Sequence, residues 1–147
     1  MPKLLAIATH QQSRGPITLH QHAFVNTENG LGDHQGNKRA STSITILSQE
    51  AWQQACAQAG ADIDWQERRA NLLADQIDFS PSDIGRQLQI GKNVICKITR
   101  ETDPCSRMDE LAPGLKAALT PDWRGGARCE VLQGGEIHCG DDIHWLD

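Results

Sequence analysis

Apolar and polar residues alternate in short runs along most of the chain, which is the pattern expected of half-buried β-strands. Gly-rich turns at 134–141, a tight hairpin turn at 91–93 and a longer polar loop at 26–39 separate these runs. The pattern therefore predicts a fold made mostly of β-strands. The runs that predict strands are 3–9, 17–25, 42–47, 68–74, 88–90, 94–99, 129–133 and 143–145.

Short helical stretches interrupt these strands. Ser48 is a good N-cap for a helix over residues 49–59, and Gly60 is suited to end it. Shorter helices are predicted around Cys105 and over residues 115–119. Two or three short helices among closely spaced strands favour a mostly-β fold that closes into a barrel, because closure removes the exposed edges of a sheet.

The length of the chain, 147 residues, is typical of one domain with a sizeable core, so we expect a single domain over residues 1–147. No segment is long and apolar enough to cross a bilayer, and no membrane partner is expected. The apolar stretch 4–8 is too short for the core of a signal peptide and predicts the first strand instead.

Charge and cysteine content narrow the classes of function. The chain has 14 Lys and Arg against 19 Asp and Glu, a net charge of −5, which argues against nucleic-acid binding. A local arginine cluster for a small anion remains compatible with this charge. Five cysteines without a secretory signal predict reduced thiols and a cytoplasmic protein, and the absence of C-x-x-C spacing argues against a zinc ribbon. The cysteines are Cys56, Cys96, Cys105, Cys129 and Cys139.

The run 100–114 carries the strongest candidate chemistry. Asp103 is a good helix N-cap and Pro104 suits the first helical position, so Cys105 is expected in the first turn of a short helix. Free amides and the positive end of the helix dipole favour a thiolate there, and Arg107 adds to this effect while neighbouring carboxylates oppose it. The alternative interpretation is a small apolar residue that packs at a corner of the barrel.

Six short runs then occur in one characteristic order over nearly the whole chain. They are 30–33, 68–73 with 77–78, 88–91, 101–108, 123–126 and 131–137 with 140–141. Together they resemble the MOSC family, which is named after the C-terminal domain of molybdenum cofactor sulfurases. The chain is similar in particular to the short, stand-alone bacterial members of that family.

The resemblance implies a strongly bent, closed β-barrel and chemistry that is centred on Cys105. It implies that Cys105 either carries sulfur, as proposed for sulfurases, or binds molybdenum, as in amidoxime-reducing members. It further implies binding of the molybdenum cofactor (molybdopterin), of molybdenum itself and of pyridoxal phosphate, a catalytic activity, and a sulfurase or reductase as a protein partner.

Two arginine-containing runs are candidates for binding an anion. Arg68 and Arg69 precede Asn71, and the arginine fork can bind a phosphate with two hydrogen bonds. Arg124 stands beside two glycines, whose backbone amides can approach an anion closely. With the resemblance, these residues are expected to bind the phosphate of a pterin cofactor. The alternatives are that Arg68 and Arg69 are solvated, that Asn71 has a structural role and that Arg124 lies in a tight turn.

Asp33 and its neighbour His34 lie in the first Gly-rich loop. They are candidates for proton transfer, metal binding or contact with the cofactor, and the alternative is an Asx-turn beside a surface imidazole. Two hypotheses of function follow. The first is a molybdenum-cofactor-associated protein that acts through Cys105. The second is a non-catalytic module that binds a small anion or a pterin phosphate and delivers it to a partner enzyme.

Overall fold

The computed structural model describes residues 1–34 and 36–146, and in this part of the chain it contains ten strands and three α-helices. The strands are β1 (Leu4–Thr9), β2 (Thr18–His20), β3 (His22–Val25), β4 (Ile44–Ser48), β5 (Leu72–Ala74), β6 (Gln87–Ile90), β7 (Val94–Glu101), β8 (Ala127–Gln133), β9 (Gly135–His138) and β10 (Ile143–Leu146). The helices are α1 (Gln49–Gln58), α2 (Arg107–Leu111) and α3 (Leu115–Leu119). Short 3-10 helices lie at η1 (Ala40–Thr42), η2 (Trp65–Arg68), η3 (Pro81–Asp83) and η4 (Pro121–Trp123).

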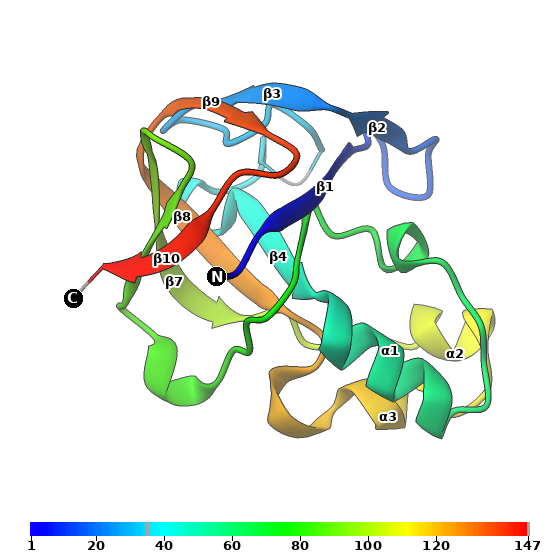
Figure 1. The fold of residues 1–147 in the computed structure, drawn as a ribbon. Helices are drawn as coiled ribbons and strands as arrows, with labels where there is room; N and C mark the ends of the chain where they lie inside the picture. Colours follow the sequence, from blue (N-terminus) through cyan, green and yellow to red (C-terminus); the bar gives the residue numbers. More distant parts are fainter. Residues whose placement is uncertain (35, 147) are drawn as a thin grey trace.

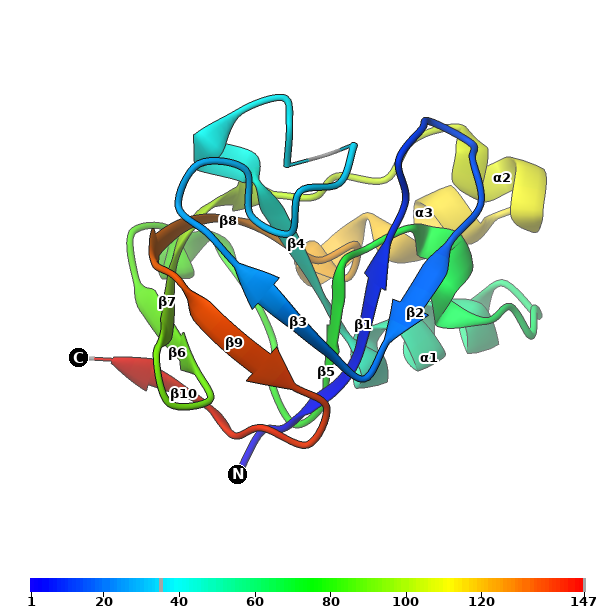
Figure 2. The same ribbon diagram turned by 90° about the horizontal axis from the view of Figure 1, so that it is seen from above.

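Eight of the strands form one sheet in the order β10-β6-β7-β8-β4-β5-β1-β2. Neighbouring strands are antiparallel except β4 and β5, which are parallel. A parallel pair needs a crossover connection, and α1 supplies it between β4 and β5. The other two strands, β3 and β9, form a separate antiparallel pair that lies over β1, β4 and β8 (Figures 1 and 2).

The prediction of a closed barrel is wrong, because the eight-stranded sheet is open and has β10 and β2 as its two edges. The run 17–25, expected as one strand, is divided at Gln21 into β2 and β3. After Gln21 the chain leaves the large sheet and pairs with β9 instead of closing onto β10. A single isolated bridge between Lys3 and Asp142 connects the beginnings of the first and last strands, and no ladder continues it within residues 1–34 and 36–146.

Two apolar clusters hold these elements together. In the first, side chains from most strands of the bent sheet meet, including Leu4, Ile46, Leu88 and Ile98, and the β3–β9 pair contributes Ile137. The second cluster lies between the sheet and the three helices, which gather at one end of the molecule (Figure 1). Burial of each large apolar side chain contributes about 1.5–3 kcal/mol, so these clusters are the main source of stability. They leave the strand ends beside the helices available for a site.

The first helix confirms the sequence prediction. Its N-cap is Ser48, whose Oγ accepts a hydrogen bond from the amide of Ala51 at 3.3 Å. Trp52 and Cys56, four residues apart and therefore on one helical face, are both buried in the second cluster. The indole N–H of Trp52 donates to the carbonyl of Ile63 at 3.0 Å, so its burial leaves no unpaired polar group.

None of the helices within residues 1–34 and 36–146 is long and apolar enough to span a membrane.

Candidate functional site

Cys105 lies in the connection between β7 and α2, directly before the N-cap of the helix. The predicted short helix is present as α2, but it begins at Arg107 with Ser106 as its N-cap, so the placement of Cys105 in its first turn is wrong. The Asp103 carboxylate does not cap the helix and instead lies 3.9 Å from the guanidinium of Arg100. Because α2 has only five residues, its dipole contributes little to stabilising a thiolate at Cys105. Other neighbouring groups therefore determine the electrostatic surroundings of the thiol.

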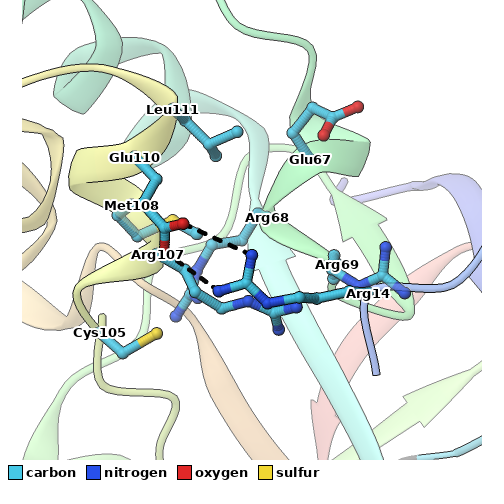
Figure 3. A pocket seen from close by; sticks show the side chains of 9 residues that line it. All are labelled: Arg14, Glu67, Arg68, Arg69, Cys105, Arg107, Met108, Glu110 and Leu111. Carbon is cyan, nitrogen blue, oxygen red and sulfur yellow. Dashed lines mark hydrogen bonds and ion pairs between the residues drawn. The ribbon is translucent and has the colours of Figure 1, made fainter. Parts of the chain in front are cut away.

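The exposed thiol of Cys105 stands where two cavities adjoin. One has a volume of about 270 Å³ and lies between η2, α2 and the turn after β1 (Figure 3). The other, of about 310 Å³, extends toward the loop before β4. We call them the α2 cavity and the loop cavity. Both are lined by Cys105, Arg68, Arg69 and Arg107.

Positive side chains predominate around the thiol. Five arginines and one lysine line the two cavities, against three carboxylates. In a chain with a net charge of −5 this is a local reversal of sign, which favours an anionic ligand or a thiolate. The basic residues are Arg14, Lys38, Arg68, Arg69, Arg107 and Arg128, and the acidic ones are Glu67, Asp103 and Glu110.

Arg68 is a buried arginine that fixes the segment bearing the thiol. Its side chain is 9% exposed, its Nη2 donates to the carbonyl of Thr102 at 2.8 Å, and its Nε donates to the carbonyl of Gly125 at 3.2 Å. Burial lowers the pKa of the guanidinium to about 10, opposed by nearby Cys105, so the group stays charged at neutral pH. Arg68 thus connects η2 to both strand ends while its charge faces the cavities.

Gly125 permits this close approach. A Cβ atom at residue 125 would lie 2.5 Å from the carbonyl oxygen of Thr102 and 3.0 Å from Nη2 of Arg68. The glycines of the run 123–126 therefore pack against the protein's own backbone, as the tight-turn alternative describes.

Arg69 and Arg14 are held in strained backbone conformations at the mouth of the α2 cavity. Both have a positive φ, +64° for Arg69 and +63° for Arg14, which costs a non-glycine residue about 1–2 kcal/mol. The Nη2 of Arg69 donates to the carbonyl of Gln12 at 3.2 Å. Arg14 forms an ion pair of 3.1 Å with Glu110 of α2, which lies across the cavity (Figure 3). Such strain is concentrated at binding and catalytic sites in proteins.

Three buried polar atoms beside the thiol have no hydrogen-bond partner among residues 1–34 and 36–146: Nε of Arg69, Nε of Arg128 and Oγ1 of Thr102. All three residues line the loop cavity. Burial of such a group without a partner costs about 1–3 kcal/mol, so a ligand with acceptor oxygens would be favoured here. In contrast, no group of three or more His, Cys, Asp or Glu side chains suited to a metal ion exists among residues 1–34 and 36–146.

Asp33 and Asn71, two further candidates, form a buried polar network next to the loop cavity without lining it. The amide Nδ2 of Asn71 donates to Oδ2 of Asp33 at 2.7 Å and to the carbonyl of Ala8 at 3.2 Å, while its Oδ1 accepts from the amide of Thr45 at 3.0 Å. The other carboxylate oxygen of Asp33 accepts from the amide of Gly36 at 3.0 Å. These bonds tie β1, β4 and the first Gly-rich loop together.

The structure does not place Arg124 beside the other candidate residues at Cys105. Its Nη1 donates to Oε1 of Gln58 at 2.8 Å and to the carbonyl of Ala118 at 3.0 Å. It lines a third cavity, which Cys105 does not line, together with Asp122 and Phe79. The expected anion role of Arg124 therefore stays a prediction that is separate from the cavities at Cys105.

Several residues of the site were not predicted from the sequence, among them Arg14, His10, Lys38 and Glu110. The sequence of the run 13–16, Ser-Arg-Gly-Pro, is typical of a turn and gives Arg14 no partner. Nothing in the sequence indicates that this tip lies against α2, because the contact joins residues 96 positions apart.

We expect Cys105 to be alkylated first among the five cysteines. Cys56, Cys96 and Cys129 are buried, and burial raises the pKa of each thiol, to about 12 for Cys96. Burial also raises the pKa of the half-buried Cys139. Limited reaction with iodoacetamide and peptide mapping check the order, and earlier labelling of Cys56 or Cys96 would contradict it.

Comparison with known proteins gives a family and a fold. The sequence pattern of the MOSC domain matches residues 31–144. The fold is similar to that of the YuaD protein from Bacillus subtilis, with a TM-score of 0.78, 16% identity, and coverage of 100% of this chain and 98% of that one. It is also similar to YiiM from Geobacillus stearothermophilus, with a TM-score of 0.72, 14% identity, and coverage of 100% and 76%.

A third similar structure is YiiM from Escherichia coli, with a TM-score of 0.68, 10% identity, and coverage of 99% of this chain and 70% of that one. At these identities the structural likeness concerns the fold alone. No curated protein matches the sequence.

Proposed function

Because the chain belongs to the MOSC domain family, which is linked to molybdenum cofactor sulfurases, we propose that it is a molybdenum-cofactor-associated protein that works through Cys105. In this proposal the thiolate of Cys105 either carries sulfur as a persulfide or binds molybdenum. The protein partner would be a sulfurase or a reductase. Binding of pyridoxal phosphate stays a prediction.

One observation carries the proposal: the exposed thiol of Cys105 lies at the junction of two cavities that are lined mainly by arginines. A sulfur carrier needs a thiolate that a donor and an acceptor can reach in turn, and a metal ligand needs a thiolate open to the incoming cofactor. Positive charge nearby supports the thiolate in both cases.

The residues around Cys105 fit an anionic cofactor better than a bare metal ion. The unpaired Nε atoms of Arg69 and Arg128 and the Oγ1 of Thr102 could donate to phosphate or pterin oxygens. Cys105 is the one thiol available to a metal in the cavities, so the cofactor must bring further ligands of its own. When bound, the molybdenum cofactor would supply redox or sulfur-exchange chemistry at its metal. Arg68 would hold the segment of Cys105 in place.

The second candidate is a module that binds the anion and delivers it to a partner enzyme without catalysis. The unpaired donors of Arg69 and Arg128 favour it, because they could hold a phosphate independently of the thiol. Binding that survives loss of the thiol supports this candidate. Redox turnover or sulfur transfer that needs Cys105 supports the first.

The test is to purify the protein from a host that makes the cofactor, and to measure bound molybdenum by elemental analysis and the Cys105 persulfide by intact mass. The proposal expects stoichiometric molybdenum or one added sulfur atom at Cys105. The proposal is contradicted if the freshly purified protein contains neither molybdenum nor a persulfide, and if neither is found after incubation with a sulfane-sulfur donor or with the isolated cofactor.

Replacing Arg69 with alanine should weaken the binding of a pterin phosphate about tenfold, because a charge-assisted hydrogen bond contributes about 1.5–3 kcal/mol. Arg124→Ala is the matched control, since Arg124 lines a different cavity and already bonds Gln58. Isothermal titration of both variants measures the affinities. An equal loss in Arg124→Ala would instead support a shared site that includes Arg124, and no loss in either would exclude both arginines.

A further inference from the structure

Two arginines stand directly opposite each other where β7 and β8 meet at the loop cavity. Arg128 of β8 lines the cavity, and its antiparallel partner in β7 is Arg100. Residues that are paired in this way project their side chains on the same face of the sheet, with Cβ atoms about 4.5–5.5 Å apart. Like charges at such a position destabilise the strand pair. The pair therefore indicates a place where a negative group would be favourable.

A third arginine, Arg39, reaches the same place from the loop before β4. Arg39 is the N-cap of η1, and the hydroxyl of Thr99 lies 2.7 Å from the carbonyl oxygen of Ser41 in η1. The same hydroxyl lies 3.1 Å from the carbonyl oxygen of Arg128, so η1 is held against the beginning of β8. Arg39 and Arg100 are exposed and do not line the cavity, whereas Arg128 is half-buried and does. We call Arg39, Arg100 and Arg128 the rim arginines.

Carboxylates compensate little of this positive charge. Among the described residues, Asp103 is the one acidic side chain that lines the loop cavity, and it lies 3.9 Å from Arg100. Burial lowers the pKa of the Arg128 guanidinium, and Arg100 and Arg39 lower it further, while Asp103 opposes them. Arg128 thus carries an unpaired buried Nε, like-charged neighbours and one partly compensating carboxylate. Such surroundings favour an anionic ligand that donors of this kind can hold.

The unpaired donors of the loop cavity come from two different elements. The Nε of Arg69 belongs to the residue that ends η2, and the Nε of Arg128 belongs to β8. The rim arginines extend the second group outward, whereas Arg68 adds a buried charge beside the first. The volume of the cavity, about 310 Å³, is at the lower end of the range of about 300–1,000 Å³ that is usual for small-molecule sites. This arrangement suits a compact ligand with two adjacent anionic groups.

We propose that the loop cavity and its rim bind a diphosphate group, with one phosphoryl group at Arg69 and the next at the rim arginines. This rests on the proposed function, in which arginines of this cavity bind a phosphate, and it specifies the ligand as a diphosphate ester. The arginine fork can hold phosphate oxygens with two parallel hydrogen bonds. The second phosphoryl group would also separate the charges of Arg100 and Arg128, which relieves the repulsion between them.

The experiment compares inorganic phosphate with inorganic pyrophosphate by isothermal titration at one low ionic strength and without Mg²⁺. The proteins are the wild type, Arg100→Gln and Lys92→Gln. Lys92→Gln is the matched control, because it removes one positive charge from an exposed lysine that lines none of the three cavities. We expect Arg100→Gln to lose about tenfold in affinity for pyrophosphate and less than about twofold for phosphate. Lys92→Gln should bind both anions like the wild type.

The difference between the two anions is the decisive result. Pyrophosphate carries more charge than phosphate, so tighter binding of pyrophosphate by the wild type does not by itself support the proposal. The proposal is overturned if Arg100→Gln weakens both anions equally, if it matches Lys92→Gln, or if the wild type binds neither anion. Because Arg100 is exposed, its replacement should leave the fold intact, and the far-ultraviolet circular dichroism of the variant checks this.

Titration with ADP distinguishes two sources of the same chemistry. A loss in Arg100→Gln that is equal for ADP and pyrophosphate supports a diphosphate ester as the ligand, and a loss for pyrophosphate alone overturns the ester. None of these titrations needs molybdenum or a sulfur donor. A protein that passes them but contains neither molybdenum nor a persulfide therefore refutes the proposed function and not the diphosphate site. A protein that fails them but contains molybdenum refutes the diphosphate site alone.

Discussion

Replacing Cys105 with serine should abolish persulfide formation and cysteine-dependent molybdenum binding while the fold stays intact. Serine is similar in size to cysteine, and its hydroxyl cannot form a persulfide and is a far weaker ligand for a soft metal. Because Cys105 is exposed, the new hydroxyl stays hydrated, so the free energy of unfolding should change by less than about 1 kcal/mol. Intact mass, elemental analysis and a urea melt of the same sample measure all three quantities.

The matched control is Cys96→Ser. Cys96 is fully buried in the first apolar cluster, so a hydroxyl there loses its hydration and the free energy of unfolding should fall by about 1–3 kcal/mol. Persulfide formation at Cys105 should be unchanged at temperatures where this variant is folded. A large loss of stability in Cys105→Ser would support a packing role for Cys105 and remove the main argument for its function.

Replacing Asn71 with alanine should be among the most destabilising single changes in the chain, at about 3–5 kcal/mol. The substitution removes at once the bonds that Asn71 makes to the amide of Thr45, the carbonyl of Ala8 and Oδ2 of Asp33, all in a buried region. Urea unfolding, followed by tryptophan fluorescence, measures the loss.

Asn37→Ala is the comparison for this prediction. Asn37 lies in the same loop region but is exposed, and its one side-chain bond, to the carbonyl of Gly32, is 3.4 Å long. Its replacement should change the free energy of unfolding by about 0.5 kcal/mol or less. If Asn71→Ala were as mild as Asn37→Ala, the buried network would not be a source of stability.

Local features of the fold were predictable from the sequence, and long-range ones were not. Ser48 as the cap of α1 and the hairpin around Gly91 depend on neighbouring residues, so propensity and turn chemistry suffice. The open sheet depends on whether β2 pairs with β10, which are more than a hundred residues apart. The sequence predicts turns over residues 134–141, where the structure has β9, because the first residue of this strand is the second glycine of a Gly-Gly pair.

For the site, the sequence indicated the thiol and three of the arginines around it, Arg68, Arg69 and Arg107, while the position of Cys105 relative to the helix was predicted wrongly. Asp103 and Pro104 have the residue types of a helix start, but the bond from Arg68 to the carbonyl of Thr102 holds the segment just before them, and the helix begins only at Arg107. A tertiary contact therefore overrode a local preference. The same limit applies to His10, whose Nδ1 lies 3.9 Å from Oδ2 of Asp33, 23 positions away in the sequence.

Because Arg68 anchors the segment of Cys105 to the strands, the position of the thiol and the shape of the cavity wall can change independently during evolution. Arg68 fixes the position of the thiol from the side of the strands, through Thr102 and Gly125, and within residues 1–34 and 36–146 its side chain forms no hydrogen bond with α2 or α3. Residues of α2, in contrast, form a wall of the α2 cavity, and Arg107 also lines the loop cavity. Related proteins can therefore lengthen, shorten or rewrite this helical segment and so select different molecules for entry, while the same reactive atom stays in the same place.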